Sequence, residues 1–267
     1  YFIYWIKKLM NFTKEQTQYF RDNFDKLSYA QMGEDVGIPK SKRSLVAKFC
    51  KELGLIRLSG RDFDEHVLDD WYSDSAYLIG YLVADGNVCF EEGKHYDVII
   101  RSCAKDVEHL EKIRSLFKAK KPLKYIKSTN SYCLGLSSKY LCLRLIELGV
   151  VPNKTNFGVF VEVPDEYLRE FVCGMFDADG CMSVDKRNAV KWVSWHLFQS
   201  SNSISFLEYL QTKIEKQSGS YLSLLKNKDT LYYLYASCSN ADKLCAWMYS
   251  GKSISMDRKK QRYLTHR

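Results

Sequence analysis

The chain has 267 residues, of which 46% are hydrophobic, enough for a small domain and a larger one with buried cores. Lys and Arg number 40 against 32 Asp and Glu, so the formal net charge of +8 favours a polyanionic partner. The nine cysteines include no C-x-x-C pair, which argues against a zinc cluster or disulfide framework and favours a reducing compartment.

The opening segment, YFIYWIKKL at 1–9, is aromatic but much shorter than the roughly 20 apolar residues that cross a bilayer. It also lacks the layout of a secretory signal peptide, and we expect no membrane partner. Three origins stay open for it: translation from an upstream reading frame, an artificial addition, or a strand that packs elsewhere.

Residues 10–60 carry the pattern of a small all-α domain. Thr13 and Gln16 match a capping box, which predicts a helix over about 14–23. A second short helix is expected after it, because apolar residues return at helical spacing and Gly37 suits its C-terminal left-handed position.

A third helix of this domain is predicted from about Ser41 to Leu53, with an inward face formed by Leu45, Val46 and Phe49. A tight glycine-containing turn before a basic last helix is typical of a helix-turn-helix. The stretch 40–61 has seven Lys or Arg, and we expect them to neutralise DNA phosphates. The contact candidates are Lys40, Lys42, Arg43 and Lys48. The alternative is a solvated bundle that docks on its neighbour.

An acidic and aromatic stretch at 61–75 is interpreted as a linker that folds onto the next domain. The ten-residue pattern YLIGYLVADG at 77–86 then returns as FVCGMFDADG at 171–180. The sequences beyond the two copies are also alike, since AKDVEHLEKIRSLF at 104–117 matches SNSISFLEYLQTKI at 201–214. The chain beyond the linker is therefore a repeated unit.

Each copy predicts the order helix, strand, strand, helix, strand, strand, helix. The expected strands include DVIIRS and SYCLGLS in the first copy, and WVSWHLF and LYYLYAS in the second. A four-stranded antiparallel sheet is too small to stand well alone, so the units are expected to pair across a pseudo-twofold axis. The predicted fold class is α+β: two αββαββα repeats, at 76–155 and 156–267, preceded by the small all-α domain.

The two motifs, their spacing and the order of elements resemble the LAGLIDADG homing endonucleases in their single-chain form. The resemblance covers nearly all of 76–267, and the stretch 148–180 is similar to the family's bridge between repeats. It implies a site-specific, Mg²⁺-dependent endonuclease that cuts both strands of a long double-stranded DNA target, with Mn²⁺ or Ca²⁺ as substitutes in a structure. A monomer without a nucleotide cofactor is expected, in the cytoplasm of a bacterial or phage-infected cell or in an organelle.

In both copies a glycine stands five residues before an acid, Gly80 before Asp85 and Gly174 before Asp179. A glycine within a helix costs about 1 kcal/mol relative to alanine, so its repeated placement indicates a close approach of two backbones. If the two helices pack side by side, Asp85 and Asp179 meet at the axis as catalytic carboxylates.

Two carboxylates at helix C-termini repel one another and favour a cation, and oxygen ligands suit Mg²⁺. The resemblance implies that the carbonyls of Ala84 and Ala178 join Asp85 and Asp179 as metal ligands. The alternative is a pair of Asp-Gly helix ends inherited from an active ancestor. The motifs also differ, because Val83 stands where the second copy has Asp177.

The sheets are expected to supply the DNA surface. Between 112 and 146 there are nine Lys or Arg and no Asp or Glu. The alternation in SYCLGLS predicts one buried and one open face, and an antiparallel ribbon can read base edges in the major groove. Candidates for the open face are Arg101, Lys124, Lys191, Lys226 and Lys228, and Lys127 is a further DNA-contact candidate. For any single lysine, simple solvation is an equal alternative.

The family places a basic or polar residue near each metal site, and Lys139, Lys154 and Lys191 are candidates for that role. Two other functions stay open on the same fold, a non-cleaving DNA-binding regulator and an intron maturase. The presence of both terminal aspartates argues against the regulator. The helix-turn-helix pattern favours duplex DNA over structured RNA.

Overall fold

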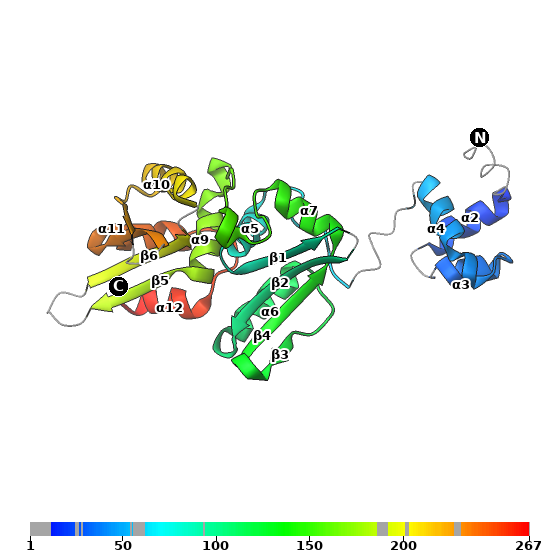
Figure 1. Ribbon diagram of the computed structural model, residues 1–267, viewed down its shortest axis with the longest axis horizontal. Helices are drawn as coiled ribbons and strands as arrows, with labels where there is room; N and C mark the ends of the chain where they lie inside the picture. The colour runs from blue at the N-terminus through cyan, green and yellow to red at the C-terminus, as the bar shows by residue number, and fades with distance from the viewer. Residues whose placement is uncertain are drawn as a thin grey trace. The chain divides into compact units, whose positions relative to one another are not determined.

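The computed structural model describes residues 12–24, 27, 29–53, 55, 62–92, 94–185, 192–200, 203–226 and 231–266. The chain divides into two compact units, residues 1–61 and 62–267, and each is described by itself (Figure 1). The opening segment 1–9 lies outside the described residues. Within the described ranges, no helix has the length and apolar character needed to cross a membrane.

The first unit has three α-helices in its described part: α2 (Lys14–Asn23), α3 (Tyr29–Asp35) and α4 (Arg43–Glu52), with a single 3₁₀ turn, η1 (Lys40–Lys42), before α4. The predicted capping box is present, since Thr13 and Gln16 each accept a hydrogen bond from the other's backbone N–H, at 3.1 and 3.0 Å. Gly37 follows α3 with a φ of 83°, as predicted. The core of this unit is Phe20, Phe24, Met32, Val46 and Cys50.

The prediction for Leu45 is wrong. Its side chain is 38% exposed, whereas Val46 and Cys50 are fully buried. The buried stripe of α4 is centred on Val46 and Cys50, which are four residues apart and therefore on one face of the helix. Leu45 falls at the margin of that stripe.

The second unit contains two four-stranded antiparallel sheets, and each repeat follows the predicted order αββαββα (Figure 1). The first repeat consists of α5 (Ser73–Asp85), β1 (Gly86–Glu91), β2 (His95–Cys103), α6 (Val107–Leu116), β3 (Lys124–Ile126), β4 (Ser131–Ser137) and α7 (Lys139–Glu147). The second consists of α9 (Leu168–Asp179), β5 (Cys181–Asp185), β6 (Trp192–Ser200), α10 (Ile204–Ser218), β7 (Ser223–Lys226), β8 (Leu231–Ser237) and α11 (Cys238–Tyr249). The predicted fold class is confirmed.

Two further helices follow the repeats. The single turn α8 (Lys154–Phe157) comes after the first repeat, and α12 (Asp257–His266) comes after the second. The strand orders are β1-β2-β4-β3 and β5-β6-β8-β7, so the same topology occurs twice.

Helices α5 and α9 form the centre of the second unit. Every residue of α5 from Ser75 to Ala84 is buried. A Cβ atom added at Gly80 would lie 2.0 Å from the carbonyl oxygen of Phe171, and one added at Gly174 would lie 2.1 Å from that of Tyr77. Since real Cβ atoms do not approach backbone this closely, only glycine allows the two helices to meet.

Each sheet has one covered and one open face. In the first sheet Ile100 pairs with Leu134, and both are buried. Gly135 and Ser137 point the other way and are exposed, as the alternation in SYCLGLS predicts. The helices of each repeat therefore cover one face of its sheet and leave the other open.

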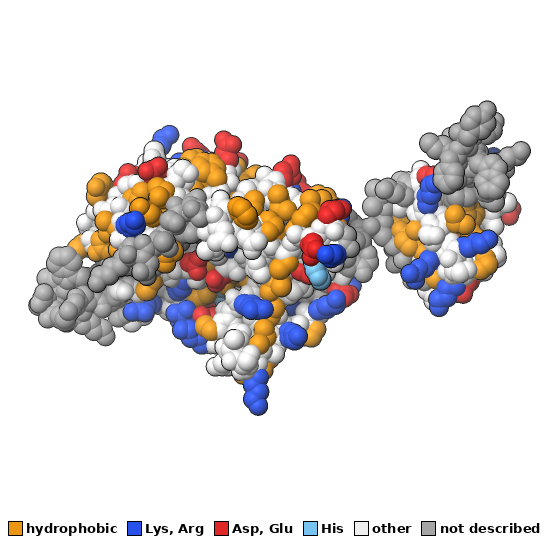
Figure 2. Space-filling model, in the orientation of Figure 1, with side chains coloured by type: hydrophobic (Ala, Val, Ile, Leu, Met, Phe, Trp, Pro, Cys, Tyr) orange, Lys and Arg blue, Asp and Glu red, His pale blue; other side chains and the backbone are white. Residues whose placement is uncertain are grey.

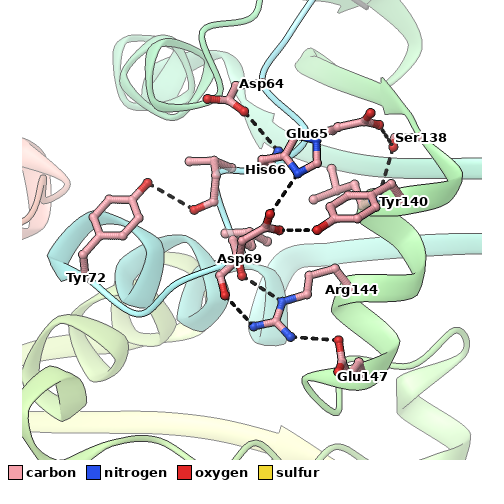
Figure 3. A network of polar contacts seen from close by, with 12 residues as sticks. Asp64, Glu65, His66, Asp69, Tyr72, Ser138, Tyr140, Arg144 and Glu147 are labelled. Carbon is pink, nitrogen blue, oxygen red and sulfur yellow. Dashed lines mark hydrogen bonds and ion pairs between the residues drawn. The ribbon is translucent and has the colours of Figure 1, made fainter. Parts of the chain in front are cut away.

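The segment predicted as a linker packs against α7 (Figure 3). Arg144 donates to the carbonyl oxygens of Leu68 and Asp69, at 3.0 and 2.9 Å. The Tyr140 hydroxyl donates to the Asp69 carboxylate at 2.8 Å, and His66 Nδ1 lies 2.8 Å from the same carboxylate. These bonds attach the chain to the second unit immediately before α5 begins.

Candidate active site

Asp85 and Asp179 are the last residues of α5 and α9. The next residue in each case is a glycine with a φ of −70° and an extended backbone, Gly86 or Gly180, which turns the chain into the first strand of its sheet. The close approach of the two helices therefore brings both carboxylates to one place.

The surroundings of Asp85, including the nearby Asp179, raise its pKa. Asp85 keeps solvent access at the end of its helix, yet the surrounding protein removes much of its hydration. The pKa of Asp85 is raised to about 6, chiefly by this burial and in addition by the charge of Asp179 and a hydrogen bond with it. Lys154 and Lys259 act in the opposite direction. The site therefore has an excess of negative potential that a cation would relieve.

A lysine contacts the last turn of each helix. Lys154 Nζ donates to the carbonyl oxygens of Leu82, Ala84 and Gly86, at 2.9, 2.6 and 2.6 Å. Leu82 and Ala84 lie in the last turn of α5, and Gly86 directly follows it. The Leu82 carbonyl also accepts the N–H of Gly86, whereas the carbonyls after it have no partner further along the helix, and the helix dipole is negative at this end. An ammonium group satisfies both requirements.

Lys259 makes the equivalent contacts on α9. Its Nζ donates to the carbonyl oxygens of Phe176, Asp177 and Gly180, at 2.7, 2.8 and 2.7 Å, and lies 3.4 Å from that of Ala178. Burial lowers the pKa of Lys259 and lowers that of Lys154 to about 8. The aspartates counteract this effect in both cases.

Of the described lysines predicted to assist the site, Lys154 lies at it. Lys139 instead pairs with Glu92 at 2.6 Å, and Lys191 lies outside the described residues. Sequence reasoning missed Lys259, which lies in the stretch MDRKKQR at 256–262, outside both copies of the repeated motif. The available signal was its position, since a lysine follows the last helix of each repeat.

The donor chemistry of the site fits a divalent cation that binds oxygen. Asp85 and Asp179 supply carboxylate oxygens, and no group of three or more His, Cys, Asp or Glu in the described part of the chain forms a complete cage. Mg²⁺ commonly binds one or two carboxylates together with substrate phosphates, so two acids suffice. The Ala84 and Ala178 carbonyls, predicted as further ligands, both lie within bonding distance of a lysine ammonium.

The DNA-contact candidates of the first sheet lie on or beside its open face. Arg101 of β2 and Lys124 of β3 both face Cys133 across the ladder, opposite the buried side, and both are exposed. Lys127 is exposed in the turn between β3 and β4. Figure 2 shows Lys and Arg side chains along the lower side of the larger unit, over the first sheet and near α12.

The prediction that Lys226 lies on the open face of its sheet is wrong, although its side chain is exposed at the end of β7. Lys226 pairs with Tyr232, and the register places it on the same face as the buried Leu234. Its ammonium lies 5.4 Å from the centroid of the Tyr232 ring at the end of the strand. The pairing of β7 with β8 determines the face on which Lys226 lies. Lys228, a further candidate for the open face, lies outside the described residues.

The basic residues predicted for DNA contact by the first unit are exposed. Lys40 and Lys42 lie in η1, and Arg43 and Lys48 lie in α4. None of the four belongs to the buried core of this unit. The geometry leaves this basic surface open to a partner.

The fold is similar to that of solved LAGLIDADG homing endonucleases. The meganuclease I-AabMI, bound to uncleaved DNA, has a TM-score of 0.52 and 16% identity over 71% of this chain and 88% of that one. I-DmoI in complex with DNA and Ca has a TM-score of 0.51 and 16% identity, over 73% and 98%. I-GzeII in complex with its DNA target has a TM-score of 0.52 and 11% identity, over 73% and 89%. No family model matches the chain, and no curated protein does.

Proposed function

We propose that this protein is a DNA endonuclease that cuts both strands of a long, specific target with the help of a divalent cation. The observation that carries the proposal is the convergence of Asp85 and Asp179 at the ends of α5 and α9. Solved proteins of the same fold are bound to DNA, and one such structure contains Ca.

The cation would be held by the carboxylates of Asp85 and Asp179, with the carbonyls of Ala84 and Ala178 as further ligands. When bound, Mg²⁺ supplies Lewis-acid stabilisation of the phosphodiester and lowers the pKa of water. The pKa of Asp85, raised by burial and by the charge of Asp179, supports this assignment, because a bound cation would offset both effects.

Lys154 and Lys259 would fix the helix ends and add positive charge at the site. Each ammonium is held by three carbonyl oxygens within 2.9 Å, so its position is set before substrate arrives. Charges already in place where negative charge develops on a phosphate stabilise the transition state without reorganisation. One lysine serves each half of the pseudodimer.

The duplex would lie along the open faces of the two sheets, with each repeat reading one half-site. Arg101, Lys124 and Lys127 are the described basic residues of the first sheet suited to this role. The first unit would extend the contact through Lys40, Lys42, Arg43 and Lys48. Phosphate contacts of this kind make binding weaken steeply with salt.

The test is cleavage of a plasmid library of candidate target sites by the purified protein with Mg²⁺. We expect linear product from one site, and no product from Asp179→Asn although that variant still binds the site. Glu166→Gln, which alters an exposed acid two residues before the start of α9, is the matched control and should cut normally.

The other outcomes of this test identify the alternatives. Sequence-specific binding without cleavage by the unaltered protein would support a non-cleaving regulator and overturn the nuclease proposal. Preference for structured RNA over duplex DNA in the same binding assay would support a maturase. A flat salt response would count against a duplex partner.

A further inference from the structure

A buried chain of polar side chains crosses from the first repeat to the second and ends beside Lys259. The Tyr77 hydroxyl of α5 lies 2.7 Å from the Asp177 carboxylate of α9 and 2.9 Å from Nε2 of His109 on α6. All three side chains are buried. Because the Tyr77 proton is donated to Asp177, Nε2 of His109 carries the proton that it donates to Tyr77.

The same carboxylate oxygen of Asp177 also holds the start of α12. It accepts a hydrogen bond from the backbone N–H of Met256 at 2.6 Å. The Met256 carbonyl in turn accepts a hydrogen bond from the backbone N–H of Lys259 at 3.1 Å, within the first turn of α12. Asp177 thus determines where α12 begins, and Lys259 is less than one helical turn further along.

A second buried acid on α9 holds the chain that leads to this point. Glu170 is seven residues before Asp177, so both lie on one face of the helix. Its Oε1 accepts a hydrogen bond from the backbone N–H of Lys252 at 3.3 Å. A Cβ added at Gly251 would lie 2.9 Å from the same oxygen. The segment 251–256 is therefore held against α9 at both ends.

The first repeat has apolar residues at the equivalent positions. Alignment of the two motifs places Val83 opposite Asp177 and Ala76 opposite Glu170. The chain leading to Lys154 instead passes through Asn153, which has a φ of 53°, into the single turn α8. The two lysines occupy matching positions but are placed by different means.

The other members of the polar chain are replaced in the same way. The second repeat has Phe171 opposite Tyr77 and Phe206 opposite His109, and the two phenylalanine rings lie 6.2 Å apart. This apolar arrangement packs well enough to be fully buried. Packing alone therefore does not require the polar chain, because the protein already contains an apolar version of it.

We propose that Asp177 is a positioning residue, which holds the start of α12 so that Lys259 stays on the last turn of α9. The consequence for cleavage depends on the proposed function, whereas the placement of Lys259 does not. One catalytic half then depends on a buried polar clamp, formed by Tyr77, Asp177 and the Met256 N–H, and the other half does not.

The decisive variants are Asp177→Val, which introduces the residue used by the first repeat, and Asp177→Asn. The asparagine oxygen can accept from both Tyr77 and Met256, and its amide group replaces Oδ1, which has no partner among the described residues. In Asp177→Val the helix stays attached, because Arg258 still makes two bonds to Asp106, at 2.7 and 3.0 Å.

The readout is the rate at which each lysine is acetylated, measured by mass spectrometry on the DNA-free protein. We expect Asp177→Val to raise the rate at Lys259 about tenfold, the effect of losing one hydrogen bond to a charged group. Lys154 is the internal control and should stay within about twofold, the scatter expected of an uncoupled site. Asp177→Asn keeps the hydrogen bonds but loses the charge that raises the pKa of Lys259, so it should raise the rate at Lys259 less than Asp177→Val does and leave Lys154 unchanged.

An unchanged rate at Lys259, a parallel rise at Lys154, or equal rates in the two variants would each overturn the proposal. If Asp177→Val does not fold, the triple variant Tyr77→Phe, His109→Phe and Asp177→Val introduces the complete apolar set and should show the same rise at Lys259. Failure of the proposed function would appear separately, as absence of cleavage by the unaltered protein while the acetylation pattern holds.

Where cleavage is observed, the two DNA strands provide the second readout. We expect Asp177→Val to slow the cutting of one strand about tenfold more than the other, because only one lysine is displaced. Asp177→Asn should restore equal rates. Equal slowing of both strands would contradict the assignment of the clamp to one half.

Discussion

Lys154 and Lys259 make the same contact in the two repeats. Each ammonium lies within 2.9 Å of the carbonyl oxygens at both edges of a final helical turn, those of Leu82 and Gly86 or of Phe176 and Gly180. The two lysines come from dissimilar helices. Lys154 belongs to α8, which has four residues, and Lys259 belongs to α12, which has ten. The two lysine contacts therefore follow the pseudo-twofold symmetry more closely than the helices that carry the lysines do.

Removing either lysine is expected to leave three helix-end carbonyls without their charged donor. We expect Lys154→Met and Lys259→Met each to lower the free energy of unfolding by about 2 kcal/mol, measured by urea denaturation. The control is Lys139→Met, whose partner Glu92 is exposed, so its loss should lower the free energy of unfolding by clearly less. Similar values for all three variants would show that the carbonyl contacts contribute no more than a surface pair.

The helix contact at Gly80 is expected to tolerate no side chain. Gly80→Ala would place a Cβ 2.0 Å from the Phe171 carbonyl oxygen, and both helices are too buried to move apart freely. We expect the free energy of unfolding to fall by about 3 kcal/mol, the upper end for an overpacked contact. Gly135→Ala is the control, since nothing lies within 4 Å of its added Cβ, and it should change stability by less than about 0.5 kcal/mol.

Because the pKa of Asp85 is raised, we expect a neutral side chain at this position to increase the free energy of unfolding by an amount that depends on pH. Its pKa rises from 3.8 to about 6 on folding, so the folded state binds more protons than the unfolded state between these values. The carboxylate therefore destabilises the fold above about pH 6, and this effect disappears as the pH falls below 3.8.

We expect Asp85→Asn to raise the free energy of unfolding at pH 8 by about 1 kcal/mol, a value reduced for solvent screening, and to abolish cleavage. In urea denaturation near pH 4, the increase in the free energy of unfolding should shrink toward zero. A gain of the same size at pH 4 and pH 8 would contradict the assignment to this carboxylate, and Glu166→Gln should show no gain at either pH.

Addition and removal of Mg²⁺ provide an independent test of the two carboxylates. Binding to the folded state alone should stabilise the DNA-free protein by about 2.7 kcal/mol at a concentration one hundred times Kd. Chelation should reverse the shift in Tm. The shift should be lost in Asp85→Asn and in Asp179→Asn, and its persistence in both variants would place the cation elsewhere.

The basic surface of the first unit is expected to contribute phosphate contacts. Replacing Lys42, Arg43 and Lys48 with Gln should reduce the slope of log K against log salt by about 2.7, which corresponds to three lost contacts. Filter binding or anisotropy at several salt concentrations measures this slope. Lys14→Gln, an exposed lysine at the start of α2, is the control and should leave the slope unchanged.

Local patterns were sufficient to predict the elements and the central helix pair. The capping box at Thr13 predicted the first helix, and the strand alternation around Gly135 predicted which face of the first sheet is open. The repeated glycine before each terminal acid predicted the close approach at Gly80. These properties depend on neighbours within a few residues, or on a repeat that is visible in the chain itself.

Only the tertiary structure decided the features that depend on the path of a connecting segment or on strand register. Lys259 reaches α9 because Asp177 and Glu170 hold the segment before α12, and no local pattern records that contact. The exposed Lys226 lies on the same face as the buried Leu234 because pairing with β8 sets its register. The sequence alone determined which residues the helices and strands would contain, and long-range hydrogen bonding determined which of their charges meet at the site.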